Sequence, residues 1–256
     1  MATKRVTAAV NNETHIHVNS GTTQNHGHHA LKIKLDHMNT FEPLSENQKL
    51  FFDMYRGGGY FTFLLGSPGV GKTFLALYRA IEEVLQKDNP FQEVVIVRST
   101  VQTRDVGFLP GSLEEKQEIF ELPYKEICTT LFSRPDAYQR LKEQGYVRFI
   151  STTAIRGISV DNAIIIVDEI QNMNWGELST VLTRVGHRSK IIFCGDKFQN
   201  DLTKSKNDVS GLSQFLEVAK LMPAFQEIVF TPDDIIRSSL VRDFILACEK
   251  KGIIPS

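Results

Sequence analysis

The feature that most constrains this chain is an eight-residue phosphate-binding loop that follows a short apolar run. The run, Phe61 to Leu65, predicts a buried strand, and the loop after it reads GSPGVGKT. In such a loop, glycines let several backbone N–H groups point at one anion, and the positive end of the next helix adds to the attraction. Apolar residues recur at helical spacing from Phe74 to Gln86, so the sequence predicts both the strand and the helix that this loop needs.

The positions of the loop have expected roles in holding ATP and Mg²⁺. The Lys72 ammonium would reach the β- and γ-phosphates, and the Thr73 hydroxyl would hold Mg²⁺. A Gly/Pro turn with an incidental lysine is the alternative, and the strand and helix on either side disfavour it. The predicted nucleotide-binding residues are Gly66, Ser67, Pro68, Gly69, Val70, Gly71, Lys72 and Thr73.

A second apolar strand, predicted at Ala163 to Val167, ends in Asp168 and Glu169. Buried carboxylates are costly unless something binds them, and Mg²⁺ beside a phosphate loop would be such a partner. Parallel strands place their carboxyl ends at the ligand-binding side of a sheet. We therefore expect Asp168 to hold Mg²⁺ through water, and Glu169 to orient or deprotonate the attacking water. A surface turn after a core strand is the alternative.

Two glutamines are further candidates. Gln48 lies near the start of a helix expected to run to Tyr55, where its amide could both donate to and accept from an adenine edge. A solvated surface glutamine is the alternative. Gln199 follows another predicted strand, Ile191 to Cys194, and its amide could sense the γ-phosphate.

Arg237 stands in a predicted turn before the last predicted helix. Its guanidinium could stabilise the charge that develops on a phosphoryl group in the transition state. It could equally pair with Asp233 or Asp234 on the surface, and the residues alone leave both interpretations open.

Strands that alternate with helices predict a doubly wound, mostly parallel α/β sheet, which we expect to occupy residues 41–256. Residues 1–40 have a different composition and contain six of the seven histidines. They predict a disordered polar tail, with a metal-binding or pH-sensitive arm as the alternative.

Composition limits the possible partners and compartments. The net charge of −1 gives no overall basic signature, so any nucleic-acid contact must come from a local patch. No apolar run approaches the roughly 20 residues that span a bilayer, so we expect no membrane association. The three cysteines are far apart in the sequence and do not indicate a disulfide framework, which fits a protein of the reducing cytoplasm.

Eight sequence motifs, taken in chain order, resemble those of the PhoH family of phage and bacterial P-loop ATPases. The resemblance covers about residues 41–251, and the family in turn resembles the first motor domain of superfamily 1 helicases. The family's name links it to phosphate starvation, but none of these residues bears on that link. The motifs are GSPGVGKT, GFLPGSLEEK, AIRG, VDEIQN, LTRVG, GDKFQNDL, SGL and DDIIRSS.

This resemblance implies a RecA-like fold in which the strand at Ile191 lies between the strands at Phe61 and Ala163. It implies an adenine-reading role for Gln48, membership of the DEIQN box for Gln171, and γ-phosphate sensing for Gln199. It also favours an arginine-finger role for Arg237.

The resemblance further implies an oligomer. A helicase of this type needs a second RecA-like domain to close the nucleotide cleft, and no second phosphate-loop domain fits into 256 residues. We therefore expect a homo-oligomeric ring, a hexamer, in which Arg237 of one subunit reaches the ATP of the next.

Two functions remain open. The first is a Mg²⁺-dependent ATPase coupled to single-stranded RNA or DNA in the cytoplasm, which is the host's if a phage encodes the chain. Candidate nucleic-acid contacts are Arg98, Thr100, Arg104 and Arg156, all in loops at the nucleotide side of the sheet. The second is an ATP-switched assembly protein that binds a protein partner. A small-molecule kinase is disfavoured, because Glu169 suits water attack and no Arg-rich lid pattern is present.

Overall fold

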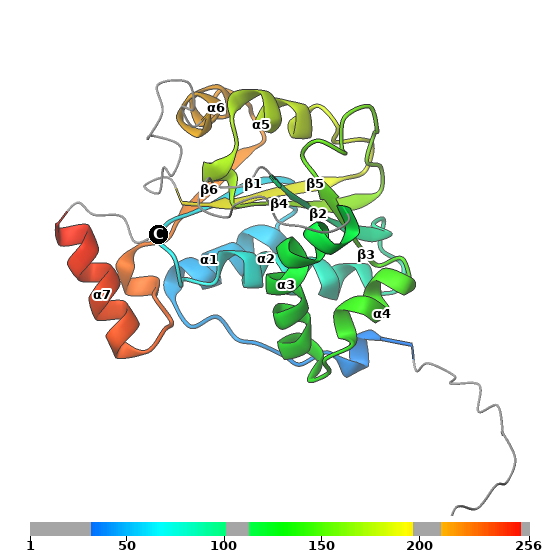
Figure 1. Cartoon of the computed structure of the whole chain (residues 1–256), viewed down its shortest axis with the longest axis horizontal. Coiled ribbons are helices and arrows are strands. Elements are labelled where there is room, and N and C mark those ends of the chain that lie inside the picture. The colour runs from blue at the N-terminus through cyan, green and yellow to red at the C-terminus, as the bar shows by residue number, and fades with distance from the viewer. Residues whose placement is uncertain (1–31, 101–112, 197–210, 252–256) are drawn as a thin grey trace, which may run out of the picture. The chain divides into compact units, whose positions relative to one another are not determined.

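The computed structural model describes residues 32–100, 113–196 and 211–251 (Figure 1). In this part of the chain, six short runs form one parallel sheet. The four inner strands are largely apolar and buried, as is typical of parallel strands covered on both faces, whereas the two edge strands are partly exposed. The strands are β1 (Phe61–Leu65), β2 (Glu93–Arg98), β3 (Val147–Ser151), β4 (Ala163–Asp168), β5 (Lys190–Gly195) and β6 (Phe225–Val229).

The strand order is β3-β2-β4-β5-β1-β6. β5 lies between β1 and β4, as the resemblance implied, so the predicted doubly wound, RecA-like α/β fold is confirmed. Because all six strands run in one direction, the carboxyl ends of β1, β4 and β5 lie side by side. The phosphate loop therefore meets the acids that end β4 at what we call the carboxyl end of the sheet.

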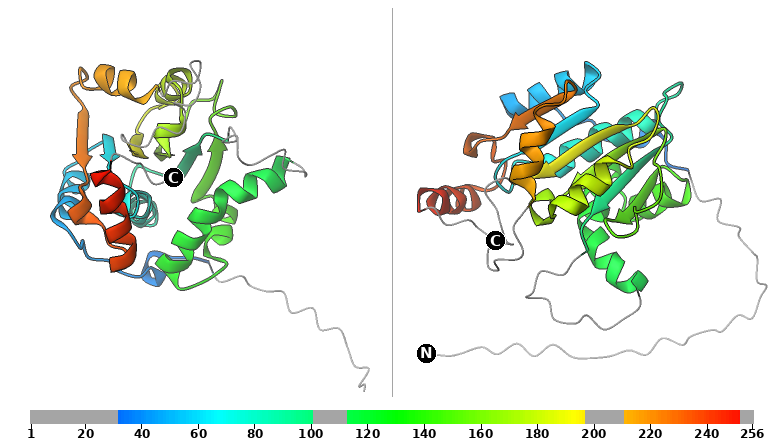
Figure 2. Two further views of the ribbon diagram at one scale, coloured as in Figure 1. Left: turned by 60° about the vertical axis from the view of Figure 1, so that its left-hand side comes forward. Right: turned by 90° about the horizontal axis from the view of Figure 1, so that it is seen from above.

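Helices cover both faces of the sheet, as Figures 1 and 2 show. On one face, aliphatic and aromatic side chains of four helices build the larger core. These helices are α1 (Glu46–Arg56), α2 (Lys72–Val84), α3 (Leu113–Phe132) and α4 (Ala137–Glu143). The second core packs the other face against α5 (Trp175–Leu182) and α6 (Leu212–Ala219). The last helix, α7 (Ser239–Lys250), contacts the 3-10 turn η4 (Pro232–Asp234). No helix in these described ranges has the length and apolar character needed to cross a bilayer.

The packed part of the chain begins before residue 40. Ile33 is buried in the larger core, and the 3-10 turn η1 (Leu35–His37) follows it. The backbone N–H of Asn39 then donates to the Leu131 carbonyl at 2.7 Å. The expected boundary at residue 40 is therefore too late, because a single buried isoleucine produces no periodic pattern. The rest of the expected tail, residues 1–31, lies outside the described residues.

Candidate nucleotide-binding site

The phosphate loop curls between β1 and α2 because its glycines adopt backbone conformations that other residues avoid. Gly66, Gly69 and Gly71 have φ angles of 145°, 85° and 87°. A Cβ atom on Gly66 would lie only 2.5 Å from the Phe230 carbonyl oxygen, so a larger residue does not fit there. Gly71 is the N-cap of α2, so the loop ends at the positive end of that helix. The result is a site built for an anion.

The Lys72 side chain folds back over this loop. Its Nζ donates to the carbonyl oxygens of Gly66 at 2.8 Å and Ser67 at 2.9 Å. Burial lowers the pKa of Lys72, whereas the negative charge of Asp196 is the strongest opposing influence. The ammonium is thus held at the mouth of the loop, where a phosphate would offer it a charged partner.

Asp168 ends β4 and is held through both of its carboxylate oxygens. Thr73 Oγ1, at the start of α2, donates to Oδ1 at 2.8 Å, and Tyr124 Oη, on α3, donates to Oδ2 at 2.9 Å. The two predicted metal-binding residues therefore come together, although 95 positions separate them. Hydroxyl and carboxylate oxygens are the hard donors that Mg²⁺ prefers, so this pair fits the ion.

Glu169 has a left-handed backbone, with φ 55° and ψ 44°. This conformation costs a non-glycine residue on the order of 1 kcal/mol and is typical of functional sites. Gln171 connects the side chain to β5: its Nε2 donates to Glu169, and its Oε1 accepts from the Asp196 N–H at 3.1 Å. Burial, followed by the charge of Asp168, raises the pKa of the Glu169 carboxyl. A fixed carboxyl with a raised pKa suits proton abstraction from water.

These groups line one cavity of about 520 Å³. The phosphate loop and the ends of β4 and β5 form one part of its lining, and α3 and the segment before α7 form the rest. Ser67 and Val70 of the loop are buried. The predicted site residues that line the cavity are Pro68, Gly69, Gly71, Lys72, Thr73, Asp168, Glu169 and Arg237.

Gln48 also reaches the phosphate loop. The residue is 2% exposed, so the alternative of a solvated surface glutamine is wrong. Its Nε2 donates to the Val70 carbonyl at 3.2 Å, and its Oε1 accepts from the Leu44 N–H at 2.8 Å. Both ends of the amide thus hold backbone groups next to the loop. Adenine reading stays a prediction.

Arg237 lies over the phosphate loop of its own chain. A Cβ atom on Gly69 would be 2.9 Å from Arg237 Cγ, so the side chain covers that glycine. The acids that were its alternative partners are engaged elsewhere: Asp233 lies 3.3 Å from Arg242, and Asp234 caps its own turn. The expected reach of Arg237 to the ATP of a neighbouring subunit stays a prediction.

Arg98, predicted as a nucleic-acid contact, faces the site. Burial on its own would lower the pKa of the guanidinium, but Tyr124, Asp168 and Glu169 together raise it. The Phe120 ring of α3 lies 5.8 Å from its Cζ. Arg98 therefore belongs to the surroundings of the two acids.

The other predicted contacts divide into two groups. Arg156 is exposed in the turn that follows β3, and Thr100 is half-buried after β2. Both lie at the carboxyl end of the sheet. Gln199 and Arg104 fall outside the described residues, so their roles stay predictions.

Sequence reasoning missed two residues of this site. Asp196 follows the end of β5 just as Asp168 ends β4, so an acid at a strand end was an available signal. Tyr124 has no local signal, because its contact with Asp168 spans 44 positions and depends on how α3 packs.

Comparison with known proteins gives a consistent result. The family model described as "PhoH-like protein" matches residues 40–249. The PhoH-like protein of Synechocystis sp. is 33% identical over 190 residues, covering 74% of this chain and 56% of the relative. The PhoH-like protein of Bacillus subtilis is 32% identical over 191 residues, covering 74% and 58%. The chain thus spans little more than half the length of these relatives.

The similarity to solved structures is low both in sequence identity and in TM-score. The large terminase of a thermophilic bacteriophage matches with 13% identity and a TM-score of 0.47, over 79% of this chain and 50% of the terminase. No conclusion about function rests on that similarity.

Proposed function

The chain belongs to the PhoH family, and on that premise we propose that it binds ATP with Mg²⁺ and hydrolyses it in the cavity at the carboxyl end of the sheet. One observation carries the proposal: the 2.8 Å contact between Thr73 Oγ1 and Asp168 Oδ1, with Glu169 as the next residue. This contact joins the phosphate loop to the acidic strand end, which is the arrangement that a P-loop NTPase uses.

In the proposed reaction, Thr73 and Asp168 would hold the ion, and Mg²⁺ when bound would neutralise charge on the phosphate oxygens. Lys72 would exchange its two carbonyl contacts for the β- and γ-phosphates. Glu169 would take a proton from the attacking water, and Gln171 would keep the Glu169 carboxyl oriented.

Arg237 would act within its own subunit. Its position over Gly69 supports this arrangement, because the guanidinium can reach phosphates held in the same loop. Mixing experiments test the assignment: Arg237→Ala and Lys72→Ala subunits, both impaired alone, should stay impaired when combined. Recovery of turnover in the mixture would show that Arg237 serves the neighbouring subunit.

Coupling to a single-stranded nucleic acid is the finer part of the proposal. Exposed Arg156 and half-buried Thr100 support it, because both follow strands whose carboxyl ends lie on the same side of the sheet as the cavity. The test is the ATP hydrolysis rate with and without single-stranded RNA and DNA at one stated salt concentration. The Lys72→Ala variant measures contaminating activity. Stimulation by either nucleic acid is the expected result, and an unchanged rate with both would contradict coupling.

An ATP-switched assembly protein is the second candidate, and one surface favours it. Leu240, Val241 and Phe244 share one face of α7 and are 77%, 41% and 60% exposed. Exposed apolar faces of this kind are typical of protein interfaces. We propose that this face takes part in a homo-oligomeric ring. Light scattering with ADP and with an ATP analogue should show an oligomer that Phe244→Lys weakens, whereas a monomer under both conditions would contradict the ring.

A further inference from the structure

Helix α3 places a tyrosine hydroxyl against the acid that we assign to Mg²⁺. Tyr124 is fully buried, and its Oη donates to Asp168 Oδ2 at 2.9 Å. Thr73 holds the other carboxylate oxygen at 2.8 Å. Because each carboxylate oxygen accepts a hydrogen bond, the plane of the carboxylate is fixed. Thr73, at the phosphate loop, provides one donor, and Tyr124 provides the other.

The Tyr124 hydroxyl also has a neighbour at the end of β2. Arg98, which ends β2, interacts with this hydroxyl. The Tyr124 hydroxyl therefore joins the end of β2 to the end of β4.

The same helix lines the cavity. Pro123, Glu126, Ile127 and Thr130 of α3 all face the space beside the phosphate loop. The position of α3 thus affects both the wall of the nucleotide cavity and the orientation of Asp168.

We propose that Tyr124 is a positioning residue for the magnesium ion: by fixing the Asp168 carboxylate, it sets how tightly the nucleotide complex holds the metal. This inference rests on the proposed use of Mg²⁺ with ATP. Loss of a group that orients a metal-binding residue typically weakens metal affinity by about 10- to 100-fold. For Tyr124→Phe we expect a loss of roughly 10-fold, since Thr73 still holds one oxygen.

The test measures metal binding and nucleotide binding separately. Mn²⁺, which electron paramagnetic resonance detects when free in solution, is titrated into the protein saturated with ADP. ADP affinity is measured in parallel with EDTA present. Tyr124→Phe should raise the Mn²⁺ dissociation constant about 10-fold and leave metal-free ADP binding unchanged.

Tyr138→Phe is the matched control. Tyr138 is 1% exposed on α4 and does not line the nucleotide cavity. Loss of its hydroxyl should change neither Mn²⁺ binding nor ADP binding, although it removes the same atom from the same core.

Three results would overturn the inference. The first is a Mn²⁺ dissociation constant in Tyr124→Phe equal to that of the wild type. The second is a parallel loss of Mn²⁺ and metal-free ADP binding, which would mean that the tyrosine only supports the fold. The third is a further loss of Mn²⁺ affinity when Tyr124→Phe is added to Asp168→Ala. If Tyr124 acts through Asp168, the second substitution should have no further effect on Mn²⁺ affinity.

Failure of the proposed hydrolysis would look different. A wild-type chain that binds Mn²⁺ and ADP but does not turn over ATP would sink the hydrolase proposal. The Tyr124 inference could still be tested in that case, because its readout is metal binding.

Discussion

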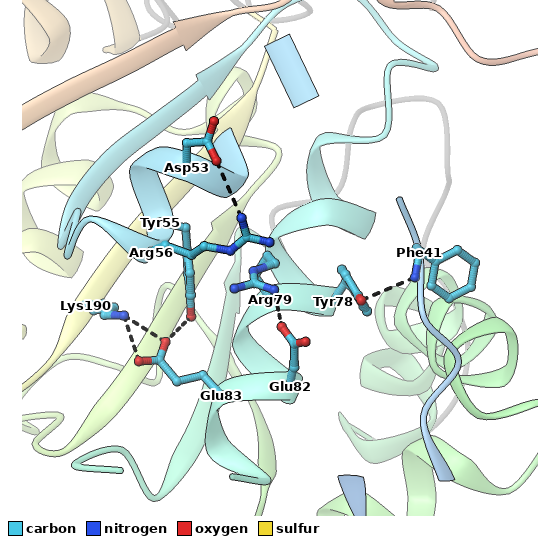
Figure 3. Close-up of polar contacts among 9 residues, drawn as sticks. All are labelled: Phe41, Asp53, Tyr55, Arg56, Tyr78, Arg79, Glu82, Glu83 and Lys190. Atoms are coloured by element: carbon cyan, nitrogen blue, oxygen red, sulfur yellow. Dashed lines mark hydrogen bonds and ion pairs between the residues drawn. The ribbon is translucent and has the colours of Figure 1, made fainter. Parts of the chain in front are cut away.

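Buried Lys190 and half-buried Lys72 lie at opposite ends of the same sheet, but their partners differ. Lys190 begins β5, and its Nζ donates to both oxygens of Glu83, at 2.9 and 2.7 Å (Figure 3). The Tyr55 hydroxyl donates to the same carboxylate, and the Lys190 ammonium lies 4.3 Å from the centre of the Tyr55 ring. Opposite charges pair directly there, so the cluster ties α1 and α2 to β5.

At the carboxyl end, three carboxylates gather beside the cations Lys72 and Arg98. Asp168, Glu169 and Asp196 follow one another around the ends of β4 and β5, and Glu169 has a strained backbone. Lys72 contacts carbonyl oxygens there, not an acid. Crowded carboxylates and strain reduce stability, and proteins keep such arrangements where a cation and an anionic ligand bind. Paired buried charge thus indicates support of the fold, and gathered carboxylates indicate a ligand site.

The largest expected effect separates the two lysines. Lys72→Ala should reduce ATP turnover to background, a loss on the order of 10³-fold, because phosphate charge is then unmatched in a preorganised site. Lys190→Met, at the other end of the sheet, should keep the wild-type rate. Steady-state hydrolysis measures both variants, and a loss of similar size in each would erase the distinction between the two ends.

Removal of the proposed general base should come next in size. Glu169→Gln keeps the shape of the side chain but cannot accept a proton, so turnover should fall about 10²- to 10³-fold. ATP binding, measured by equilibrium titration, should persist, because Lys72 and the loop remain. Wild-type-like turnover would remove Glu169 from the mechanism.

How far the sequence predicts the structure depends on whether a signal is local. The three strands predicted from the sequence match β1, β4 and β5 within about one residue, because each is a short apolar run with a clear end. The phosphate loop and the acids after β4 were predicted for the same reason. Arg98 was assigned to nucleic acid because a long basic side chain at a strand end can turn either way, and the packing of α3 decides its direction.

Contacts between distant segments escaped prediction. Tyr124 meets Asp168 only because α3 packs beside the end of β4, and nothing around Pro123 in the sequence indicates that packing. Ile33 enters the core from a polar segment, so no apolar pattern marked it.

The amino end should show its role in stability. Lys190→Met leaves the Glu83 carboxylate without its charged donor, which should cost roughly 2 kcal/mol of unfolding free energy. For a domain of this size, that corresponds to a fall of about 4–8 °C in Tm. Thermal unfolding by circular dichroism measures it, and an unchanged Tm would mean that the cluster contributes no net stability.

The smallest expected effect concerns Arg156. If this exposed arginine contacts a phosphate, Arg156→Ala should weaken single-stranded RNA binding modestly and reduce the slope of log K against log salt by about 1. Arg56→Ala is the control, since Arg56 is also exposed but lies on α1 beside Asp53 (Figure 3). Equal salt slopes for both variants and the wild type would count against a phosphate contact.

The most direct measurement pairs ATP turnover with Tm for Glu169→Gln and Lys190→Met. We predict a crossed result: Glu169→Gln loses turnover and keeps or gains Tm, because it loses a charge that Asp168 repels, whereas Lys190→Met loses Tm and keeps turnover. A Glu169→Gln protein that hydrolyses ATP at the wild-type rate would contradict the assignment of the carboxyl end as a hydrolytic site.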